Sequence, residues 1–429
     1  MIDSWGDRMM KKRAFSFLGL FFFTTSGVLA GDVLTIETLV QEALLKNPAV
    51  QSKKAEYDAL RSKVIKAWLP EDPMVGVDVE GQPDLFKTGG RMNTEYMVSQ
   101  TIPFPTKLFL DGMIASKEAD MAYQMYKEEE RAVAWRIEQP SYQLFLSKRT
   151  VAALEETQKL VEQLSSVVRS RYEANKTNQS DYLKVQIELE QISIEIFDWQ
   201  QISHIAEATI SRQLNKPLDT SYPIMREVKR FPLFLSLADL EKMALEKRPE
   251  LKSFETGIER AKASRLFSRT EWLPDITGRF EARKFKGEDE IREYDNFIGF
   301  SVPVWSLLKG IGGGWHSAQK EVEAAESLYT DMKNEVLFRI HEAYAKFKSA
   351  ENALNTYESL ILPQAKSQVD ISLSSYEAGR VDILDLIDAE RTFKNTQIGY
   401  YKALSDYEMA LSDLRLAVGD DLKGQGVDS

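Results

Sequence analysis

Residues 315–376 read WHSAQKEVEAAESLYTDMKNEVLFRIHEAYAKFKSAENALNTYESLILPQAKSQVDISLSSY and contain no glycine. The stretch is rich in Ala, Glu, Lys, Leu and Gln, which favour an uninterrupted helix. Residues 107–172 form a second stretch of similar composition, with Gly112 as its one glycine and Pro140 placed to kink it. At about 1.5 Å per residue each helix would be roughly 100 Å long. The chain is therefore predicted to be mainly α-helical and elongated.

A short break follows each long stretch, at residues 175–180 and 379–382, and a returning helix comes after it. Heptad-like stripes of apolar residues run along these helices. Helices this long bury such stripes only by packing against one another as coiled coils. We therefore expect two long antiparallel helical hairpins. The apolar stripes include Leu154, Val161, Leu164 and Val168 in one helix, and Tyr401, Leu404, Leu411, Leu414 and Val418 in another.

A region in which apolar and polar residues alternate precedes each long helix. Alternation over about ten residues predicts strands that are apolar on one face, as in a transmembrane β-barrel. A strand of a β-sandwich gives the same pattern, so alternation alone leaves both open. The apolar positions are Val75, Val77, Val79, Tyr96, Val98 and Ile102 in one hairpin, and Ile276, Gly278, Phe280, Ala282, Ile298, Phe300 and Val302 in the other.

The chain repeats its landmarks in the same order about 200 residues later. Such agreement at a nearly constant offset indicates a tandem duplication, at a period too long for a solenoid. Each half begins with a short helix that runs into a proline and a second helix. The matching landmarks are Ala43–Pro48 with Ala244–Pro249, Trp68-Leu69-Pro70 with Trp272-Leu273-Pro274, Ile102-Pro103 with Val302-Pro303, Tyr172 with Tyr376, and Asp181 with Asp385.

The duplication predicts the following organisation. The first repeat covers residues 31–233, with strands at about 74–82 and 94–103 and long helices at about 107–175 and 181–214. The second covers residues 234–419, with strands at about 275–285 and 294–303 and long helices at about 313–378 and 382–418. Residues 420–429 are predicted to be a flexible tail. The glycines of 310–314 lack the Gly-Lys-Ser/Thr ending of a phosphate loop.

Residues 1–30 are predicted to be a secretory signal peptide. A basic stretch from Met10 to Arg13 precedes an apolar stretch, and small residues end at Ala30. The apolar stretch is shorter than the roughly 20 residues that span a bilayer. Met9 or Met10 is the expected start, because Asp3 and Asp7 fit poorly in the basic region of a signal peptide. The chain is therefore predicted to be exported.

Composition argues against most kinds of active site. The chain has no cysteine and 3 histidines, which excludes disulfides and thiolate chemistry and disfavours a histidine-centred site. With 55 basic and 66 acidic residues its net charge is −11, whereas nucleic-acid binding needs a basic surface. We predict that the protein is not an enzyme and has no metal site, no cofactor and no nucleic-acid partner.

Four strands per chain are too few to close a membrane barrel, which needs about eight. Unpaired strand edges are not tolerated in lipid, so a membrane barrel requires several copies of the chain. Three copies would supply twelve strands. The same symmetry would arrange the helices of three chains as a tube, which is an α-barrel continuous with the β-barrel.

On these features the chain resembles the TolC-type outer-membrane efflux proteins, which are the exit ducts of tripartite efflux pumps. The resemblance covers the doubling, the order of elements and the turn sequence Tyr376-Glu-Ala-Gly-Arg-Val-Asp-Ile-Leu-Asp-Leu-Ile-Asp388-Ala. It implies a homotrimeric channel in the outer membrane, with its helical tube in the periplasm. Its partners would be a periplasmic adaptor, an inner-membrane pump and outer-membrane lipid.

The resemblance also implies roles for particular residues. Asp385 and Asp388 would ring the periplasmic entrance, although carboxylates at a helix start are also favoured by the helix dipole. Tyr376 and Asp181 would form a latch that keeps the entrance closed. The family's arginine at position 381 is replaced here by valine, and Arg380 or Lys176 are the candidate substitutes. The turns that would dock an adaptor consist of Ala174, Asn175, Lys176, Thr177, Ala378, Gly379, Arg380 and Val381.

Residues 100–107, QTIPFPTK, and 69–73, LPEDP, look most similar to the heavy-metal and cation efflux branch of this family. That resemblance implies metal cations as transported substrates. The alternative from a different class is an exported structural or adhesive coiled-coil protein whose hairpins form a soluble sandwich. An adaptor subunit is disfavoured, because such a chain would carry one helical hairpin and this sequence has two.

Overall fold

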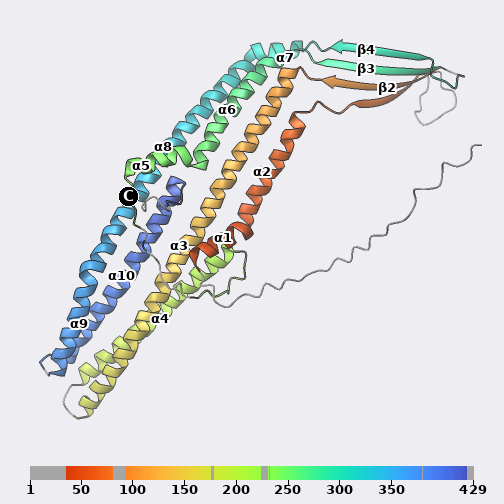
Figure 1. Cartoon of the computed structure of the whole chain (residues 1–429). Helices are drawn as coiled ribbons and strands as arrows, with labels where there is room; N and C mark the ends of the chain where they lie inside the picture. Colours follow the sequence, from red (N-terminus) through yellow and green to blue (C-terminus); the bar gives the residue numbers. More distant parts are fainter. Residues whose placement is uncertain are drawn as a thin grey trace, which may run out of the picture.

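The computed structural model describes residues 35–80, 93–174, 178–223, 230, 232–285, 287–378 and 380–422. Long helices lie side by side as a rod, and a four-stranded sheet projects from one end of it (Figure 1). The prediction of a mainly helical chain with a small β part is confirmed. The predicted signal peptide lies outside the described residues, and so does the predicted tail beyond Leu422.

The two halves of the chain follow the same order of elements. Each has two short helices, two strands, a long outgoing path and a long returning helix. The first half contains α1 (Ile36–Lys46), α2 (Pro48–Ala67), β1 (Met74–Glu80), β2 (Asn93–Ile102), α3 (Pro105–Glu173) and α4 (Gln179–Gln213). The second half contains α5 (Leu237–Lys247), α6 (Pro249–Thr270), β3 (Ile276–Phe285), β4 (Glu293–Phe300), α7 (Val304–Lys309), α8 (Trp315–Thr356), α9 (Leu362–Glu377) and α10 (Ile383–Val418).

The second long helix, predicted as one element over about 313–378, is divided in the structure. A π-helical turn, η2 (Tyr357–Ile361), separates α8 from α9. Pro363 lies in the first turn of α9, and its missing N–H cannot bond to the preceding turn. A wider turn before the proline accommodates this loss. In contrast, Pro140 lies inside α3, which continues as a single helix of 69 residues.

A second difference lies between the sheet and α8. The strand predicted to reach residue 303 ends at Phe300, and the short helix α7 and a π-helical turn, η1 (Gly310–Gly314), follow it. Gly313 adopts a φ of 136°, a conformation that side chains disfavour. The glycines that resembled a phosphate loop therefore turn the chain from the sheet into α8.

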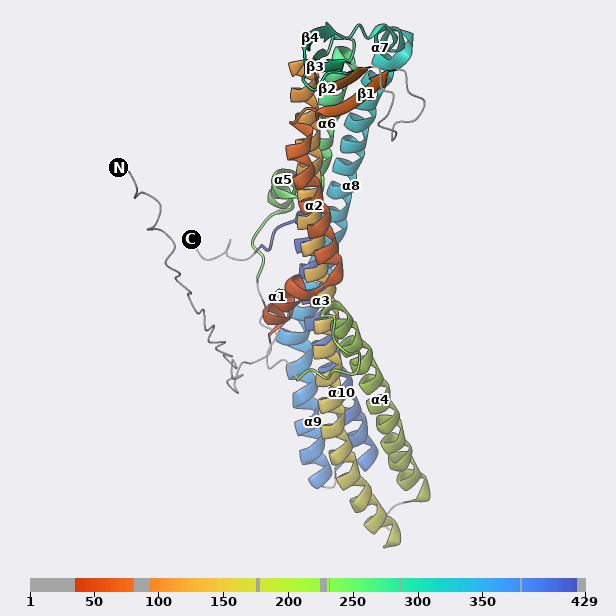
Figure 2. The same cartoon turned by 90° about the vertical axis from the view of Figure 1, so that its right-hand side faces the viewer.

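Apolar side chains are buried in three clusters spaced along the rod. One joins α1, α3 and α4, and another joins α5, α8 and α10. The third lies near the end opposite the sheet and combines the two halves, with Leu154 and Val185 beside Ile383 and Leu386. Figure 2 shows the rod from the side, with the α3–α4 hairpin and the α9–α10 hairpin both pointing away from the sheet. The helices thus pack as the long hairpins that the stripes predicted.

Candidate functional site

The sheet has the strand order β1-β2-β3-β4, and all three pairs are antiparallel. Directly paired residues lie on the same face, so the register sorts the side chains. Val77 pairs with Tyr96, which pairs with Ala282, which pairs with Tyr294. One face is therefore mainly apolar across all four strands, and its polar positions are Thr94, Gln100, Lys284 and Asn296. Its apolar members are Val75, Val77, Val79, Tyr96, Val98, Ile102, Ile276, Phe280, Ala282, Tyr294, Ile298 and Phe300.

This apolar face is uncovered by the described residues. The side chain of Val75 is 75% exposed, that of Ile298 is 74% exposed and that of Phe300 is 65% exposed. Burying a large apolar side chain is worth about 1.5–3 kcal/mol, so a contiguous exposed face of this kind marks a surface that contacts another apolar phase.

The opposite face is polar and charged. Arg283 lies 3.4 Å from Glu95 on β2 and 3.4 Å from Asp295 on β4, and Arg279 lies 2.6 Å from Glu281. Thr101 and Thr277 share a hydrogen bond of 3.0 Å across β2 and β3. The sheet therefore has one face suited to a hydrocarbon environment and one suited to water.

The helices α3 and α9, which precede the two turns predicted to dock an adaptor, both end at the end of the rod opposite the sheet (Figure 1). Ala174 ends α3, and Ala378 ends α9 with its backbone N–H bonded to Ser374. Arg380 and Val381 lie in the second turn, where Arg380 is exposed. Asn175, Lys176, Thr177 and Gly379 lie outside the described residues.

The returning helices begin with equivalent caps. Asn178 accepts a hydrogen bond from the backbone N–H of Asp181 at the start of α4, and Asp382 forms a capping box with Asp385 at the start of α10. Asp385 thus stabilises the N-terminus of α10. Asp385 and Asp388 are both exposed, whereas Ile383, Leu386 and Ile387 face the core. The two aspartates therefore share the outward side of α10, as their spacing predicts.

The structure does not join the two residues of the predicted latch. The hydroxyl of Tyr376 is buried and forms no hydrogen bond within the described residues. Its ring instead lies 4.8 Å from the guanidinium of Arg171 on α3, which is a cation–π contact. Asp181 is buried, and its carboxylate lies 3.9 Å from Lys184. A latch between Tyr376 and Asp181 thus stays a prediction.

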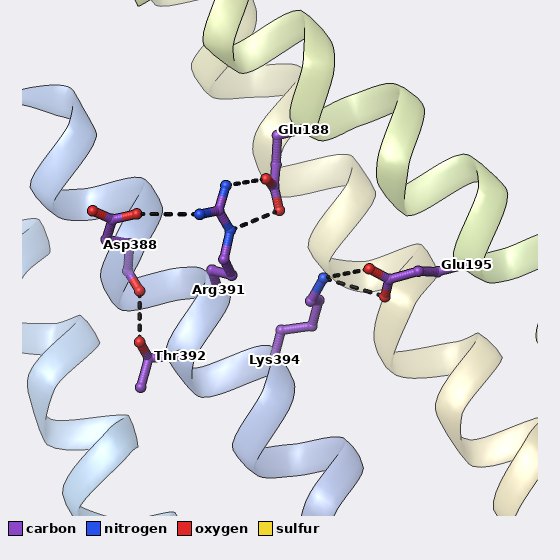
Figure 3. A network of polar contacts seen from close by, with 6 residues as sticks. All are labelled: Glu188, Glu195, Asp388, Arg391, Thr392 and Lys394. Carbon is purple, nitrogen blue, oxygen red and sulfur yellow. Dashed lines mark hydrogen bonds and ion pairs between the residues drawn. The ribbon is translucent and has the colours of Figure 1, made fainter.

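A different set of polar contacts connects the two halves near this end (Figure 3). Arg391 on α10 pairs with the buried carboxylate of Glu188 on α4 and lies 3.5 Å from Asp388. The hydrogen bond to Glu188 raises the pKa of Arg391 despite its partial burial. Since Arg391 reaches both carboxylates, it partly neutralises Asp388.

Lys394, one turn further along α10, belongs to the same network. Its side chain is 4% exposed, and its ammonium lies 3.1 Å from Glu195 on α4. Sequence reasoning missed Arg391, Lys394 and both glutamates. The repeat carries no signal for them, because the position equivalent to Arg391 in the first half is Ile187, which is not charged.

Comparison with known proteins supports the resemblance seen in the sequence. Residues 240–420 match the family described as outer membrane efflux protein. The second half of the chain therefore resembles the TolC-type outer-membrane efflux proteins. Over 181 residues it is 22% identical to the cobalt-zinc-cadmium resistance protein CzcC of Cupriavidus metallidurans, and that alignment covers 42% of each protein.

Two further similarities extend over more of the chain. The nodulation protein T of Rhizobium leguminosarum bv. trifolii is 21% identical over 59% of this chain and 56% of its own length. The matches therefore span only about half the length of these two relatives. The crystal structure of CusC, described as a transmembrane channel, superposes with a TM-score of 0.74 at 15% identity over 90% of this chain and 92% of CusC. That agreement shows that the two chains share a fold over most of their length.

Proposed function

We propose that three copies of this chain form an outer-membrane channel, which is the exit duct of a tripartite efflux system and carries substrates passively. The two-faced sheet supports this proposal most strongly. Its apolar face would contact lipid and its charged face would line a water-filled pore. The family match and the fold support the same function.

The sheet itself gives the reason for oligomerisation. Within the described sheet β1 and β4 each have a strand neighbour on one side only. Four strands are too few to close on themselves, and hydrocarbon does not tolerate unpaired strand edges. If β4 of one copy pairs with β1 of the next, three copies close a barrel of twelve strands. The long helices of the three copies would then continue the pore into the periplasm.

The far end of the helical tube would meet the other components of the pump. Both hairpin turns lie at this end, so a trimer would present six turns to a periplasmic adaptor that connects it to an inner-membrane pump. We propose that Asp385 and Asp388 surround the entrance there. We also propose that Tyr376 and Asp181 help to keep it closed, together with the contacts of Arg391 and Lys394.

The transported substrate is proposed from similarity. CzcC is named as a cobalt-zinc-cadmium resistance protein, and residues 100–107 and 69–73 resemble the metal-efflux branch. We therefore propose that metal cations are among the substrates. Carboxylates at a narrow entrance would favour cations, because they focus a negative potential along the axis.

Membrane extraction tests the channel proposal. Expressed with its predicted leader, the protein should fractionate with the outer membrane, require detergent for extraction, and migrate as a trimer of the chain, which has a mass of 49.0 kDa before the leader is removed. A monodisperse species that is soluble without detergent would contradict the proposal. It would support the alternative, an exported structural or adhesive coiled-coil protein.

Conductance in planar bilayers tests the entrance. Asp385→Asn with Asp388→Asn should strongly weaken block by a trivalent cation, because six carboxylates would be lost from one constriction. Asp382→Asn is the matched control, since asparagine caps a helix as well as aspartate does. If the double variant is blocked as readily as the parent, the two aspartates only stabilise the start of α10.

A further inference from the structure

The helix α7 and the residues on either side of it carry an exposed apolar surface. It lies where the chain leaves β4 and enters the helical rod, beside the foot of the sheet (Figure 1). Each of the side chains that form it is at least half exposed. Its members are Val302 at 80%, Val304 at 50%, Trp305 at 77%, Leu308 at 52% and Ile311 at 65% exposed.

These side chains share one side of the helix. Residues 304, 305, 308 and 311 follow the spacing of one broad helical face, with the half-buried Leu307 at its edge and the half-buried Ser306 on the other side. Lys309 is exposed at the border of the apolar face. With six residues, α7 is far too short to cross a bilayer, and none of the described helices is long and apolar enough to do so. An amphipathic segment of this kind can lie in a membrane surface.

The apolar surface of α7 continues the apolar face of the sheet. Ile298 and Phe300 belong to that face, and the exposed Val302 follows two residues after Phe300. The chain then turns into α7, where the backbone N–H of Val304 bonds to the carbonyl of Val302, so the apolar surface of α7 begins directly beyond the end of β4. If lipid covers the sheet, the same lipid reaches the start of α7.

Three tryptophans lie where the helices meet the sheet, as α7 does. Trp68 lies directly after α2 and Trp272 two residues after α6, and both helices lead into strands. Their side chains are 41% and 45% exposed. Trp305 adds a third exposed indole where the chain leaves the sheet. Tryptophan favours the boundary between headgroups and acyl chains, because its ring is apolar and its N–H is polar.

We propose that α7 is an interfacial helix that inserts Trp305, Leu308 and Ile311 into the periplasmic-side leaflet of the outer membrane. Its partner is the headgroup and acyl-chain boundary of phospholipid, with Lys309 beside the phosphates. The proposal rests on the proposed channel function and adds a second membrane contact to the barrel. In a trimer, three such helices would surround the foot of the barrel and fix its depth in the bilayer.

Single cysteines test this proposal, because the natural sequence has none. Leu308→Cys and Ile311→Cys are labelled with an environment-sensitive fluorophore, and the protein is reconstituted into vesicles of phosphatidylethanolamine and phosphatidylglycerol. Ile298→Cys on the sheet is the reference for lipid contact, and Asp331→Cys on α8 is the matched exposed control. Nitroxide-labelled lipid should quench the labels at 298, 308 and 311 to a comparable extent and leave the label at 331 unquenched.

The outcomes separate this proposal from the channel proposal. Quenching at 298 without quenching at 308 and 311 would overturn the interfacial helix while the channel stands. No quenching at 298 would contradict the channel itself. A blue-shifted but unquenched label at 308 would mean that another copy of the chain covers α7, which also overturns the proposal.

A conservative variant guards against a label that disturbs assembly. Trp305→Phe keeps the apolar ring and should assemble normally. Brominated phospholipid should quench the tryptophan fluorescence of the parent more than that of this variant, because an exposed lipid-facing indole has been removed. Equal quenching of parent and variant would show that Trp305 does not contact lipid.

Discussion

In the first half of the chain α3 continues without interruption from Pro105 to Glu173, whereas the second half covers the same path with α8, a π-helical turn and α9. The two halves also differ at the residue that joins their two short helices, which we call the joint. Asn47 in the first half and Arg248 in the second occupy equivalent positions before a proline, and each bonds to the end of its own returning helix. The two halves thus share the same order of elements, but the joint is a neutral residue in the first half and a charged residue in the second.

The charged joint, Arg248, forms ion pairs as well as hydrogen bonds. The side chain of Arg248 is 3% exposed and donates to the backbone carbonyl of Ala417 at 2.5 Å and to Glu250 at 2.8 Å. Burial raises the pKa of Glu128, 3.5 Å from Arg248, although Arg248 acts in the opposite direction. Asn47, by comparison, donates to the carbonyl and the side chain of Gln213. The second joint therefore depends on a buried cation.

The largest effect is expected at this buried cation. Arg248→Met should lower the free energy of unfolding by about 3 kcal/mol, because it removes a buried cation that pairs with the half-buried Glu128 and Glu250 and donates to the carbonyl of Ala417. Asn47→Ala should cost less, about 1–2 kcal/mol, since it removes only neutral hydrogen bonds and a helix cap. Denaturant unfolding of the detergent-solubilised protein measures both.

Lys247→Met provides the control for Arg248. Its pair with Asp420 is partly exposed, so the loss should stay below about 1 kcal/mol. Equal costs at Arg248 and Asn47 would show that the two joints are energetically alike and that the difference between the halves has no consequence for stability.

The second prediction concerns an ion pair that only the first half has. Glu207 on α4 accepts hydrogen bonds from Lys148 at 2.8 Å and from the backbone N–H of Tyr222 at 3.1 Å. The equivalent position in the second half is Leu411, in the apolar core. Burial alone would raise the pKa of Glu207, but these hydrogen bonds outweigh burial and lower the pKa below 4.5.

Because the folded-state pKa is lowered, the ionised Glu207 stabilises the fold above pH 4.5, and this contribution is lost as the pH falls through the folded-state value. Glu207→Gln should reduce the free energy of unfolding by about 1.5–3 kcal/mol at neutral pH and by less in acid. Unfolding curves across this pH range give the difference. Glu190→Gln, exposed on the same helix, should show no such pH dependence.

The smallest effect on stability, but a clear one on conduction, is expected at the contact between the halves. Arg391 is about half exposed but its partner Glu188 is buried, so Arg391→Gln, which keeps a hydrogen-bond donor for Glu188, should cost about 1 kcal/mol. It removes the ion pair with Glu188, so the closed end should loosen and the single-channel conductance should rise. Arg169→Gln, which breaks an exposed pair within α3, is the control.

Substitution of Tyr376 tests the alternative, that the predicted latch with Asp181 keeps the channel closed. Its hydroxyl forms no hydrogen bond within the described residues, so Tyr376→Phe alone should change the conductance less than Arg391→Gln does. If Tyr376→Phe combined with Asp181→Ala opens the channel more than Arg391→Gln does, closure depends on the tip and not on the contacts higher along α10.

The sequence was a good guide where structure is set locally. Alternation placed Val75, Tyr96 and Ile298 on one face of the sheet, because side chains in a strand alternate regardless of their surroundings. The spacing of Asp385 and Asp388 likewise put them on one side of α10. Helical composition and the repeat were enough to predict the order of the long elements.

The sequence could not predict the contacts between helices that are far apart in the chain, because these contacts depend on how the helices are rotated against each other. Whether Arg391 meets Glu188 is decided by the relative rotation of α10 and α4, which belong to different halves. The π-helical turn before Pro363 was missed for a similar reason. Pro140 in the first half lies within a continuous helix, so the position of a proline does not by itself predict whether the helix is interrupted.

The central claim, that the sheet separates lipid from a water-filled pore, can be tested on one strand. Asp295 and Ile298 lie on opposite faces of β4 and are 59% and 74% exposed in a single copy of the chain. Asp295→Cys and Ile298→Cys are reconstituted in planar bilayers and treated with a charged, water-soluble thiol reagent. The account predicts that only the cysteine at 295 reacts and that its modification changes the conductance. Equal reaction at both positions would contradict it, because both faces of the sheet would then be in water.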